Sequence, residues 1–155
     1  MVEYEYKNQV KAYKIYKIRI KSVSQQRDEK WRCFNEDLQK FIESNDFYSL
    51  GSTYYEMANF VKEEGKDNTY LLKLGYEAKL KVQKEGLKKY KKLEVCAGVE
   101  IIAVTNCPGN NSCKECVQLN GKVFSLDEAI LKNPLPVKNC SHKFGCRCVY
   151  GPTVN

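Results

Sequence analysis

The sequence lacks any run of about 18 uncharged apolar residues, the length that a membrane-spanning helix needs. Its opening residues are acidic and aromatic and contain no apolar stretch, so we expect no secretory signal. Both absences favour a soluble cytoplasmic protein without membrane contact. Charge of one sign is also limited, because 26 Lys and Arg against 19 Asp and Glu give a net charge of only +7. That excess is moderate and unlike that of a histone-like protein.

The chain also has little of what most catalytic sites are built from. It contains a single histidine, His142, and shows no Ser-His-Asp arrangement or glycine-rich phosphate loop. The Cys-x-x-Cys segment lacks the His-x-Glu partner of zinc deaminases. A Cys–His nucleophilic pair that uses His142 is conceivable, but this histidine lies inside a cysteine cluster, where metal ligation or loop exposure is the simpler role. We therefore expect a protein that is not an enzyme.

Proline is missing from the first hundred residues, and all four prolines fall between residues 108 and 152. Residues 1–95 are rich in Lys, Glu and Tyr with apolar residues at helical spacing, whereas residues 96–155 carry most of the cysteines. This contrast predicts an α+β protein of two regions. The first, 1–95, would be a helical bundle or helical hairpins. The second, 96–155, would be a small β/loop module stapled by zinc.

Apolar residues in the first region recur every three or four positions. Those between Val10 and Val23 predict a first helix, although the alternation around Ile18 leaves a strand as the alternative. A clearer stripe predicts the next helix: Trp31, Phe34, Leu38, Phe41 and Ile42.

Two further helices are expected before residue 95. Asp46 is a candidate N-cap for one that ends at Gly65, and Asn68 is a candidate N-cap for the other, which Gly86 would break or bend. Their expected inner residues are Phe47, Leu50, Tyr54, Ala58 and Val61 in one, and Leu71, Leu74, Ala78 and Val82 in the other.

Residues 47–54 resemble the opening of a tetratricopeptide repeat, with Phe47 in place of the usual tryptophan. Leu50, Gly51 and Tyr54 fit that pattern, whereas Glu63 stands where the repeat has a small residue. No second copy follows at a fixed period. The resemblance therefore implies one helical hairpin packed like such repeats, with an ordinary helical bundle as the alternative.

The second region predicts short strands and a brief helix. Residues 99–105 are β-branched and lie between Gly98 and Asn106, which indicates a strand. Asn120-Gly121 is a tight-turn signal, and residues 122–124 would continue it as a short strand. Ser125 is a candidate cap for a short helix with acidic residues in its first turn.

Six of the eight cysteines follow residue 106, and such a cluster in a reducing compartment favours metal binding over disulfides. Cys113 and Cys116 are separated by two residues, so their thiolates can occupy neighbouring corners of a tetrahedron around zinc. Cys140 and Cys146 would complete a structural zinc site. Unligated or disulfide-paired cysteines, or an iron–sulfur cluster, are the alternatives.

The fourth ligand is open. His142 is an alternate to Cys140, because imidazole is also a common zinc ligand. Cys148 is a second alternate, since in an extended strand it would point to the same face as Cys146. Cys107 precedes a turn-rich loop and is read as a free thiol.

The run Cys113-x-x-Cys116-x-x-Leu119-Asn120-Gly121-Lys122, followed by Pro134, Pro136 and Cys146-Arg147-Cys148, resembles the C-terminal module of phage Mu F-like head-morphogenesis (minor head) proteins. The resemblance covers roughly residues 85–150. In that family a histidine usually stands three residues before the closing cysteine pair, whereas this chain has Lys143 there. The resemblance implies a phage- or prophage-related module with a structural role.

These observations favour a non-enzymatic zinc-binding protein that acts as a structural or interaction protein and has a protein partner. The alternative is nucleic-acid binding through Lys- and Tyr-rich helices, because such runs attract phosphate. Its candidate cations form two clusters, Lys7, Lys11, Lys14, Lys17, Arg19, Lys21 and Arg27, and Lys79, Lys81, Lys84, Lys88, Lys89, Lys91 and Lys92. The oligomeric state stays open.

Overall fold

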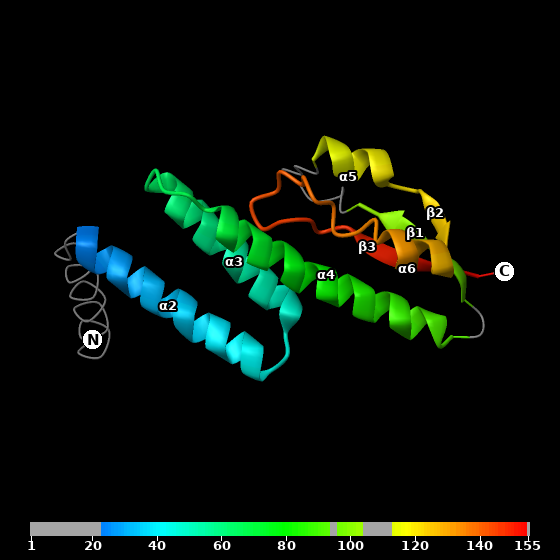
Figure 1. The fold of residues 1–155 in the computed structure, drawn as a ribbon, viewed down its shortest axis with the longest axis horizontal. Helices are drawn as coiled ribbons and strands as arrows, with labels where there is room; N and C mark the ends of the chain where they lie inside the picture. The colour runs from blue at the N-terminus through cyan, green and yellow to red at the C-terminus, as the bar shows by residue number, and fades with distance from the viewer. Residues whose placement is uncertain (1–22, 94–95, 104–112, 155) are drawn as a thin grey trace, which may run out of the picture. The chain divides into compact units, whose positions relative to one another are not determined.

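The computed structural model describes residues 23–93, 96–103 and 113–154 of the chain. These residues form an α+β fold, as predicted, in the order α2, α3, α4, β1, α5, β2, α6, β3 (Figure 1). The chain divides into two compact units, residues 1–36 and 37–155. The second unit therefore contains both the helices α3 and α4 and the sheet. The division at residue 95 that the sequence suggested stays a prediction.

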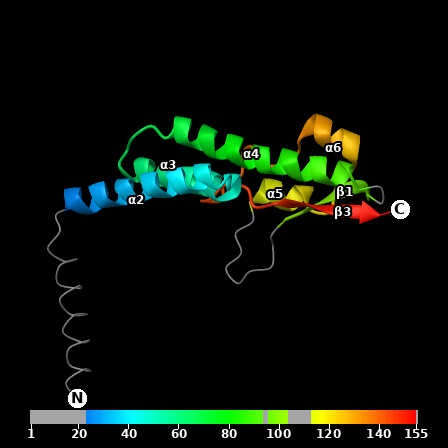
Figure 2. The same cartoon turned by 90° about the horizontal axis from the view of Figure 1, so that it is seen from below.

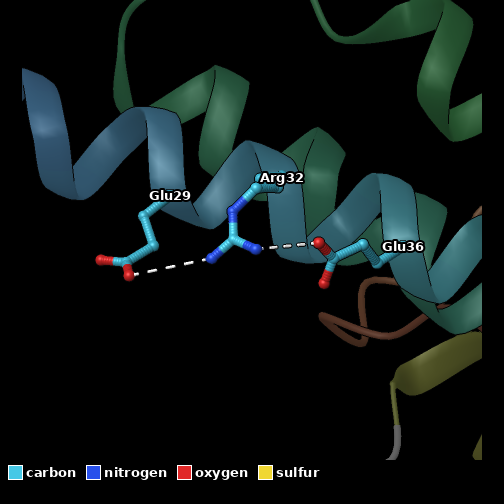
Figure 3. Close-up of polar contacts among 3 residues, drawn as sticks. All are labelled: Glu29, Arg32 and Glu36. Carbon is cyan, nitrogen blue, oxygen red and sulfur yellow. Dashed lines mark hydrogen bonds and ion pairs between the residues drawn. The ribbon is translucent and has the colours of Figure 1, made fainter.

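Helix α2 (Val23–Glu43) confirms the helix expected around Trp31. In its first part, Arg32 forms exposed ion pairs with Glu29 at 3.9 Å and Glu36 at 2.9 Å (Figure 3). Exposed pairs at this spacing contribute only a few tenths of a kcal/mol each. The rings of Trp31 and Phe34 meet edge to face, with centroids 6.0 Å apart. The first expected element, from Val10 onward, lies outside the described residues except for Val23 itself.

Helices α3 (Phe47–Glu63) and α4 (Thr69–Lys91) form a hairpin in which they run side by side (Figures 1 and 2). The predicted cap at Asp46 is confirmed, because its carboxylate accepts a hydrogen bond from the Ser49 N–H at 3.0 Å. This bond stabilises the ionised form and lowers the pKa of Asp46. Gly65, just beyond α3, has a positive φ of 72° that turns the chain toward α4.

Two details of this hairpin differ from the sequence prediction. Asn68 occupies the N-cap position of α4, but its side chain donates to the Ala58 carbonyl at 3.0 Å and makes no cap bond. The Asp67 carboxylate accepts the Thr69 N–H instead, at 3.1 Å. Gly86 does not interrupt α4, which continues to Lys91. The cost of one glycine in a long packed helix is only about 1 kcal/mol, which tertiary packing overrides.

The two helices approach each other closely where both carry glycine. A methyl group placed on Gly51 would lie 3.0 Å from the Gly75 carbonyl oxygen, and one on Gly75 would lie 3.2 Å from that of Gly51. The Gly75 methyl would also lie 2.8 Å from the ring of Tyr55. Both glycines are buried. Glycine is therefore required here because backbone and ring occupy the space of a side chain.

The sheet has three antiparallel strands in the order β2-β1-β3. Strand β1 (Cys96–Ile102) is central, and β2 (Val123–Ser125) and β3 (Val149–Val154) flank it. The predicted strand 99–105 is thus shifted, because pairing with β3 begins at Cys96 and includes Gly98. Positions 104 and 105 lie outside the described residues.

Helix α6 (Leu126–Lys132) begins as predicted, with Ser125 Oγ accepting the Glu128 N–H at 3.2 Å. The Asn120-Gly121 turn is also present, with a φ of 78° at Gly121, but it joins a helix to β2 and not two strands. That helix, α5 (Lys114–Leu119), forms at the Cys-x-x-Cys segment, where the sequence predicted no helix. The physical reason is that the side chain of Cys113 caps it.

The core of the second unit lies between the sheet and the helices α4 and α6, which contact it on one side (Figure 2). Its largest fully buried side chains are Leu87, Val99, Ile101 and Leu135. Tyr150 from β3 is buried among them; its hydroxyl accepts the Leu135 N–H and its carbonyl accepts the Tyr90 hydroxyl, both at 3.1 Å. Burial raises the pKa of Tyr150 to about 12. Four cysteines, Cys113, Cys116, Cys146 and Cys148, belong to the same core.

In the part of the chain that the structure describes, no helix combines the length and the apolar composition needed to cross a membrane.

The contact between Gly75 and Tyr55 yields a first prediction. Gly75→Ala should lower the free energy of unfolding by about 1–3 kcal/mol, because the added methyl overpacks the hairpin. Gly86→Ala is the matched control: it lies in the same helix with no atom within 4 Å of the added methyl. It should raise stability by about 0.5–1 kcal/mol. Urea denaturation of both variants measures these changes, and equal signs would contradict the packing described here.

Candidate metal centre

Five cysteine sulfurs converge in the second unit. They form two groups of three, Cys113 with Cys116 and Cys140, and Cys116 with Cys146 and Cys148. In each group all the sulfurs lie within 4.8 Å of one another, and Cys116 belongs to both. The five cysteines come from three places: the start of α5, the loop after Val137 and the segment that leads into β3. The five thiols thus join segments that are far apart in the sequence.

The sulfur spacing fits a tetrahedral metal ion. Cys116 Sγ lies 3.6 Å from Cys140 Sγ and 3.9 Å from Cys146 Sγ. In a tetrahedron with zinc–sulfur bonds of about 2.3 Å, neighbouring sulfurs are about 3.8 Å apart. Both observed separations are far longer than a disulfide bond of about 2.05 Å. Every cysteine of the described residues is a free thiol.

The start of α5 explains how the first two sulfurs are held. Cys113 is the N-cap: its sulfur accepts the Cys116 N–H at 3.4 Å, and its carbonyl accepts the Val117 N–H at 3.0 Å. An N-cap with one helical turn after it places positions 113 and 116 on the same side. The short helix therefore presents both thiols to the same point, with the N–H group of the helix turn directed at sulfur.

The thiols perturb one another's protonation. Burial by itself would raise the pKa of Cys113, but hydrogen bonds from Cys116 and other neighbours to its sulfur lower it. Hydrogen bonds from the Cys140 and Cys148 thiols lower the pKa of Cys146. In return, the pKa values of Cys140 and Cys148 are raised, in each case first by the hydrogen bond to Cys146 and then by burial.

The pKa of Cys116, the cysteine common to both groups, is raised like those of Cys140 and Cys148. Burial raises its pKa to about 12, reinforced by the hydrogen bond to Cys113. Without a cation the cluster therefore shares protons among its sulfurs, because several adjacent thiolates repel one another. A divalent cation removes this conflict, since each thiolate then faces a positive charge.

His142, the alternate imidazole ligand, belongs to neither group of sulfurs. Its Nδ1 accepts the Phe144 N–H at 3.2 Å, and its ring lies against that of Phe144 with centroids 5.7 Å apart. Burial lowers its pKa, and the positive charges of Arg147, Lys79 and Lys143 lower it further. Its environment therefore favours a neutral imidazole ring, whose Nδ1 is held by a hydrogen bond within the same turn.

The four predicted ligands fall in two overlapping groups: Cys113, Cys116 and Cys140 lie in one, and Cys116 and Cys146 lie in the other with the alternate Cys148. Of the other cysteines, Cys33 is exposed on α2 and Cys96 Sγ donates to the Gly98 carbonyl at 3.2 Å. Cys107, read as a free loop thiol, lies outside the described residues.

The helical hairpin holds the last two cysteines by their backbone carbonyls. Lys79 Nζ donates to the Cys146 carbonyl at 3.4 Å, and Gln83 Nε2 donates to the Cys148 carbonyl at 3.0 Å. Lys79 and Gln83 lie one turn apart on α4, so they face the same segment. Asn59 of α3 donates to the Lys143 carbonyl at 2.7 Å. Side chains of the two helices therefore hold the cysteine segment in place. The sequence itself did not indicate this role for them.

Tyr55 is a second connection between hairpin and cysteines. Its ring lies against Gly75 on α4 and also against Gly145, the residue before Cys146. Gly145 has a φ of 74°, a conformation that favours glycine, and a methyl group there would overlap the ring. Burial raises the pKa of Tyr55 to about 12, and the Cys140 and Cys146 thiolates contribute. Isolated glycines within helical patterns were the sequence signal for this packing.

Three lysines of the basic cluster that suggested nucleic-acid binding are buried or in contact with other side chains in the structure. Lys79 is buried, Lys91 pairs with Asp127 at 3.0 Å, and Lys81 Nζ lies 3.5 Å from the centre of the Phe47 ring. Of the N-terminal cluster only Arg27 is among the described residues. The remaining exposed lysines of α4 match the ordinary solvated face of a helix.

Comparisons of the chain with models of protein families, with curated proteins and with solved structures found no match. They provide no link to the phage head-morphogenesis or tetratricopeptide families, so both resemblances stay predictions.

Gly145 yields a second prediction, with Gly65 as its matched control because both have a positive φ. Gly65→Ala should lower the free energy of unfolding by about 1 kcal/mol. Alanine is strained in the left-handed conformation, and nothing lies within 4 Å of its added methyl. Gly145→Ala should cost clearly more, because its methyl also meets Tyr55.

Thermal or urea denaturation of the two variants gives the difference. Adding Tyr55→Leu should recover part of the loss at residue 145 and none at residue 65. Equal losses for the two glycine variants would show that the ring of Tyr55 is not pressed against this turn.

Proposed function

We propose that the protein is a non-enzymatic structural protein that holds one zinc ion through four of the clustered cysteines. Cys113, Cys116, Cys140 and Cys146 are the proposed ligands, and Cys148 is the alternate. The observation that carries the proposal is the spacing of the sulfurs around Cys116, which matches the edges of a zinc tetrathiolate. When bound, the ion would supply charge to neutralise the thiolates and would fix the segments that carry them.

The chemistry of the donor set supports zinc and a structural role. Thiolate sulfur is a soft ligand that favours zinc, copper(I) and iron–sulfur clusters, and zinc is the redox-inert member with no geometric demand of its own. A catalytic zinc needs an open coordination position for water. Here five sulfurs compete for four positions, and four of the five thiols are buried. A closed site follows from that surplus.

The position of the site shows what the ion would stabilise. It lies where α5, the loop after Val137 and the segment before β3 meet the α3–α4 hairpin. Structural zinc contributes folding free energy on the order of 10 kcal/mol in small domains. The ion would therefore hold the C-terminal segments against the hairpin.

A role in protein interaction is supported by the sheet. Ile102 and Val149 are neighbours in the β1–β3 register and are 44% and 46% exposed, and Val123 of β2 is 62% exposed. Uncovered apolar side chains on a strand face are typical of contact surfaces. The resemblance to the phage head-morphogenesis module supports the same class of function, and we include a phage or prophage origin in the proposal.

Metal analysis tests the proposal directly. The purified protein should contain about one zinc per chain, as a single four-ligand site requires. Cys116→Ser should abolish binding, because Cys116 is the only cysteine common to both groups. Cys148→Ser should retain it, because four sulfurs remain. Cys33→Ser is the matched control, since that thiol is exposed on α2, and it should bind zinc like the parent protein.

The measurements are elemental analysis and the charge-transfer absorption of the cobalt(II)-loaded protein. A protein that takes up neither ion, or whose clustered sulfurs are found in disulfides, would refute the metal site. A protein that binds iron in place of zinc would refute its structural, redox-inert character.

A further inference from the structure

Lys79 is the most unusual charged residue of the described chain. It lies in the middle of α4 and is only 2% exposed. Lysine is almost never fully buried unless it is paired, because an ammonium group loses its hydration in the interior. Lys79 has no carboxylate partner among the described residues. Its polar contact is the Cys146 carbonyl, 3.4 Å from Nζ.

Aromatic rings provide part of its environment. The ammonium lies 4.5 Å from the centre of the Tyr48 ring and 5.9 Å from that of Tyr55. Cation–π contacts and one carbonyl hydrogen bond are favourable, but neither neutralises the charge of the ammonium group. These contacts offset only part of the cost of burying the charge.

The cysteine cluster would supply the missing negative charge once its thiolates bind a cation. The carbonyl that accepts from Lys79 Nζ belongs to Cys146, whose sulfur lies within 4.8 Å of those of Cys116 and Cys148. One divalent ion with four thiolates carries a net charge of about −2. A centre with three thiolates and His142 would carry only about −1. A buried cation beside the cluster therefore fits the all-thiolate centre better.

We propose that Lys79 is the counter-charge of the metal centre: its buried ammonium stabilises the metal-bound, anionic set of thiolates and couples it to the α3–α4 hairpin. This inference rests on the proposed function, because it needs the metal to be bound. It extends that function by making a helix residue far from the cysteines in the sequence a positioning residue of the site.

The counter-charge role has a signature that a packing role lacks. The metal-free cluster carries less negative charge than four metal-bound thiolates, because adjacent thiolates repel one another, so the buried lysine then has less compensation. Replacing it by an apolar side chain of similar length should then leave the metal-free protein as stable as before, or more stable. In the metal-bound protein the same replacement leaves an anionic centre without its partner.

The test compares Lys79→Met with Lys79→Arg, which keeps the charge, and with Lys84→Met as the control for an exposed lysine of the same helix. Zinc affinity is measured on the full chain by competition with a chromophoric chelator. Thermal midpoints are measured with and without zinc. Lys79→Met should bind zinc about 10–100-fold more weakly, the usual effect of losing a partner of the ligands. Lys79→Arg should lose less, and Lys84→Met should match the parent protein.

The outcomes separate the two proposals. A parent protein that binds no zinc removes the metal site itself. Zinc binding by Lys79→Met with unchanged affinity removes the counter-charge role and leaves the metal site standing. Equal loss of thermal midpoint with and without zinc would assign Lys79 to packing and would also overturn the inference. If Lys79→Met does not fold, Lys79→Gln replaces it, and equal zinc affinities of the Arg and Gln variants would overturn the inference in the same way.

Discussion

Five neighbouring cysteines around Cys116 impose the main electrostatic constraint on the second unit, because their thiolates would repel one another. Packed this closely and mostly buried, they cannot all ionise, so protons are shared within the cluster and some pKa values rise while others fall. The five cysteines come from three separate segments of the chain. The convergence is understandable if a cation takes the place of the protons, because sulfur–sulfur contacts near 3.8 Å then become part of a coordination shell.

The convergence also explains why the helices and the cysteine segment form one unit. The carbonyl groups of Cys146 and Cys148 precede β3 and its pairing with β1, so they need other donors. Lys79 and Gln83 of α4 provide them for Cys146 and Cys148, and Asn59 of α3 does so for Lys143. The hairpin in turn gains a surface against which its buried polar groups are satisfied. Each part thus completes the other's hydrogen bonding.

Local signals in the sequence were sufficient for much of this fold. Asp46 and Ser125 cap helices as expected, and the cysteine spacing located the candidate site, because caps and ligand pairs are decided within a few residues. Features that depend on distant segments were not predictable. The strand β1 begins at Cys96 because β3 pairs with it, and the helix at the Cys-x-x-Cys segment forms because Cys113 caps it. The burial of Lys79 is of the same kind, since periodicity places lysine on the outer face by default.

The stability of the C-terminal region also depends on contacts between distant segments. The sequence predicted a small β/loop module stapled by zinc. In the structure, Val99, Ile101 and Leu135 are fully buried together with Leu87 of α4. The hairpin therefore contributes to the core that the sheet packs against. Hydrophobic burial therefore already orders the strands, and four of the five clustered cysteines belong to the same core. A metal ion at that point would add to a formed core, which makes it a clamp on the Cys140–Cys148 segment more than the nucleus of the fold.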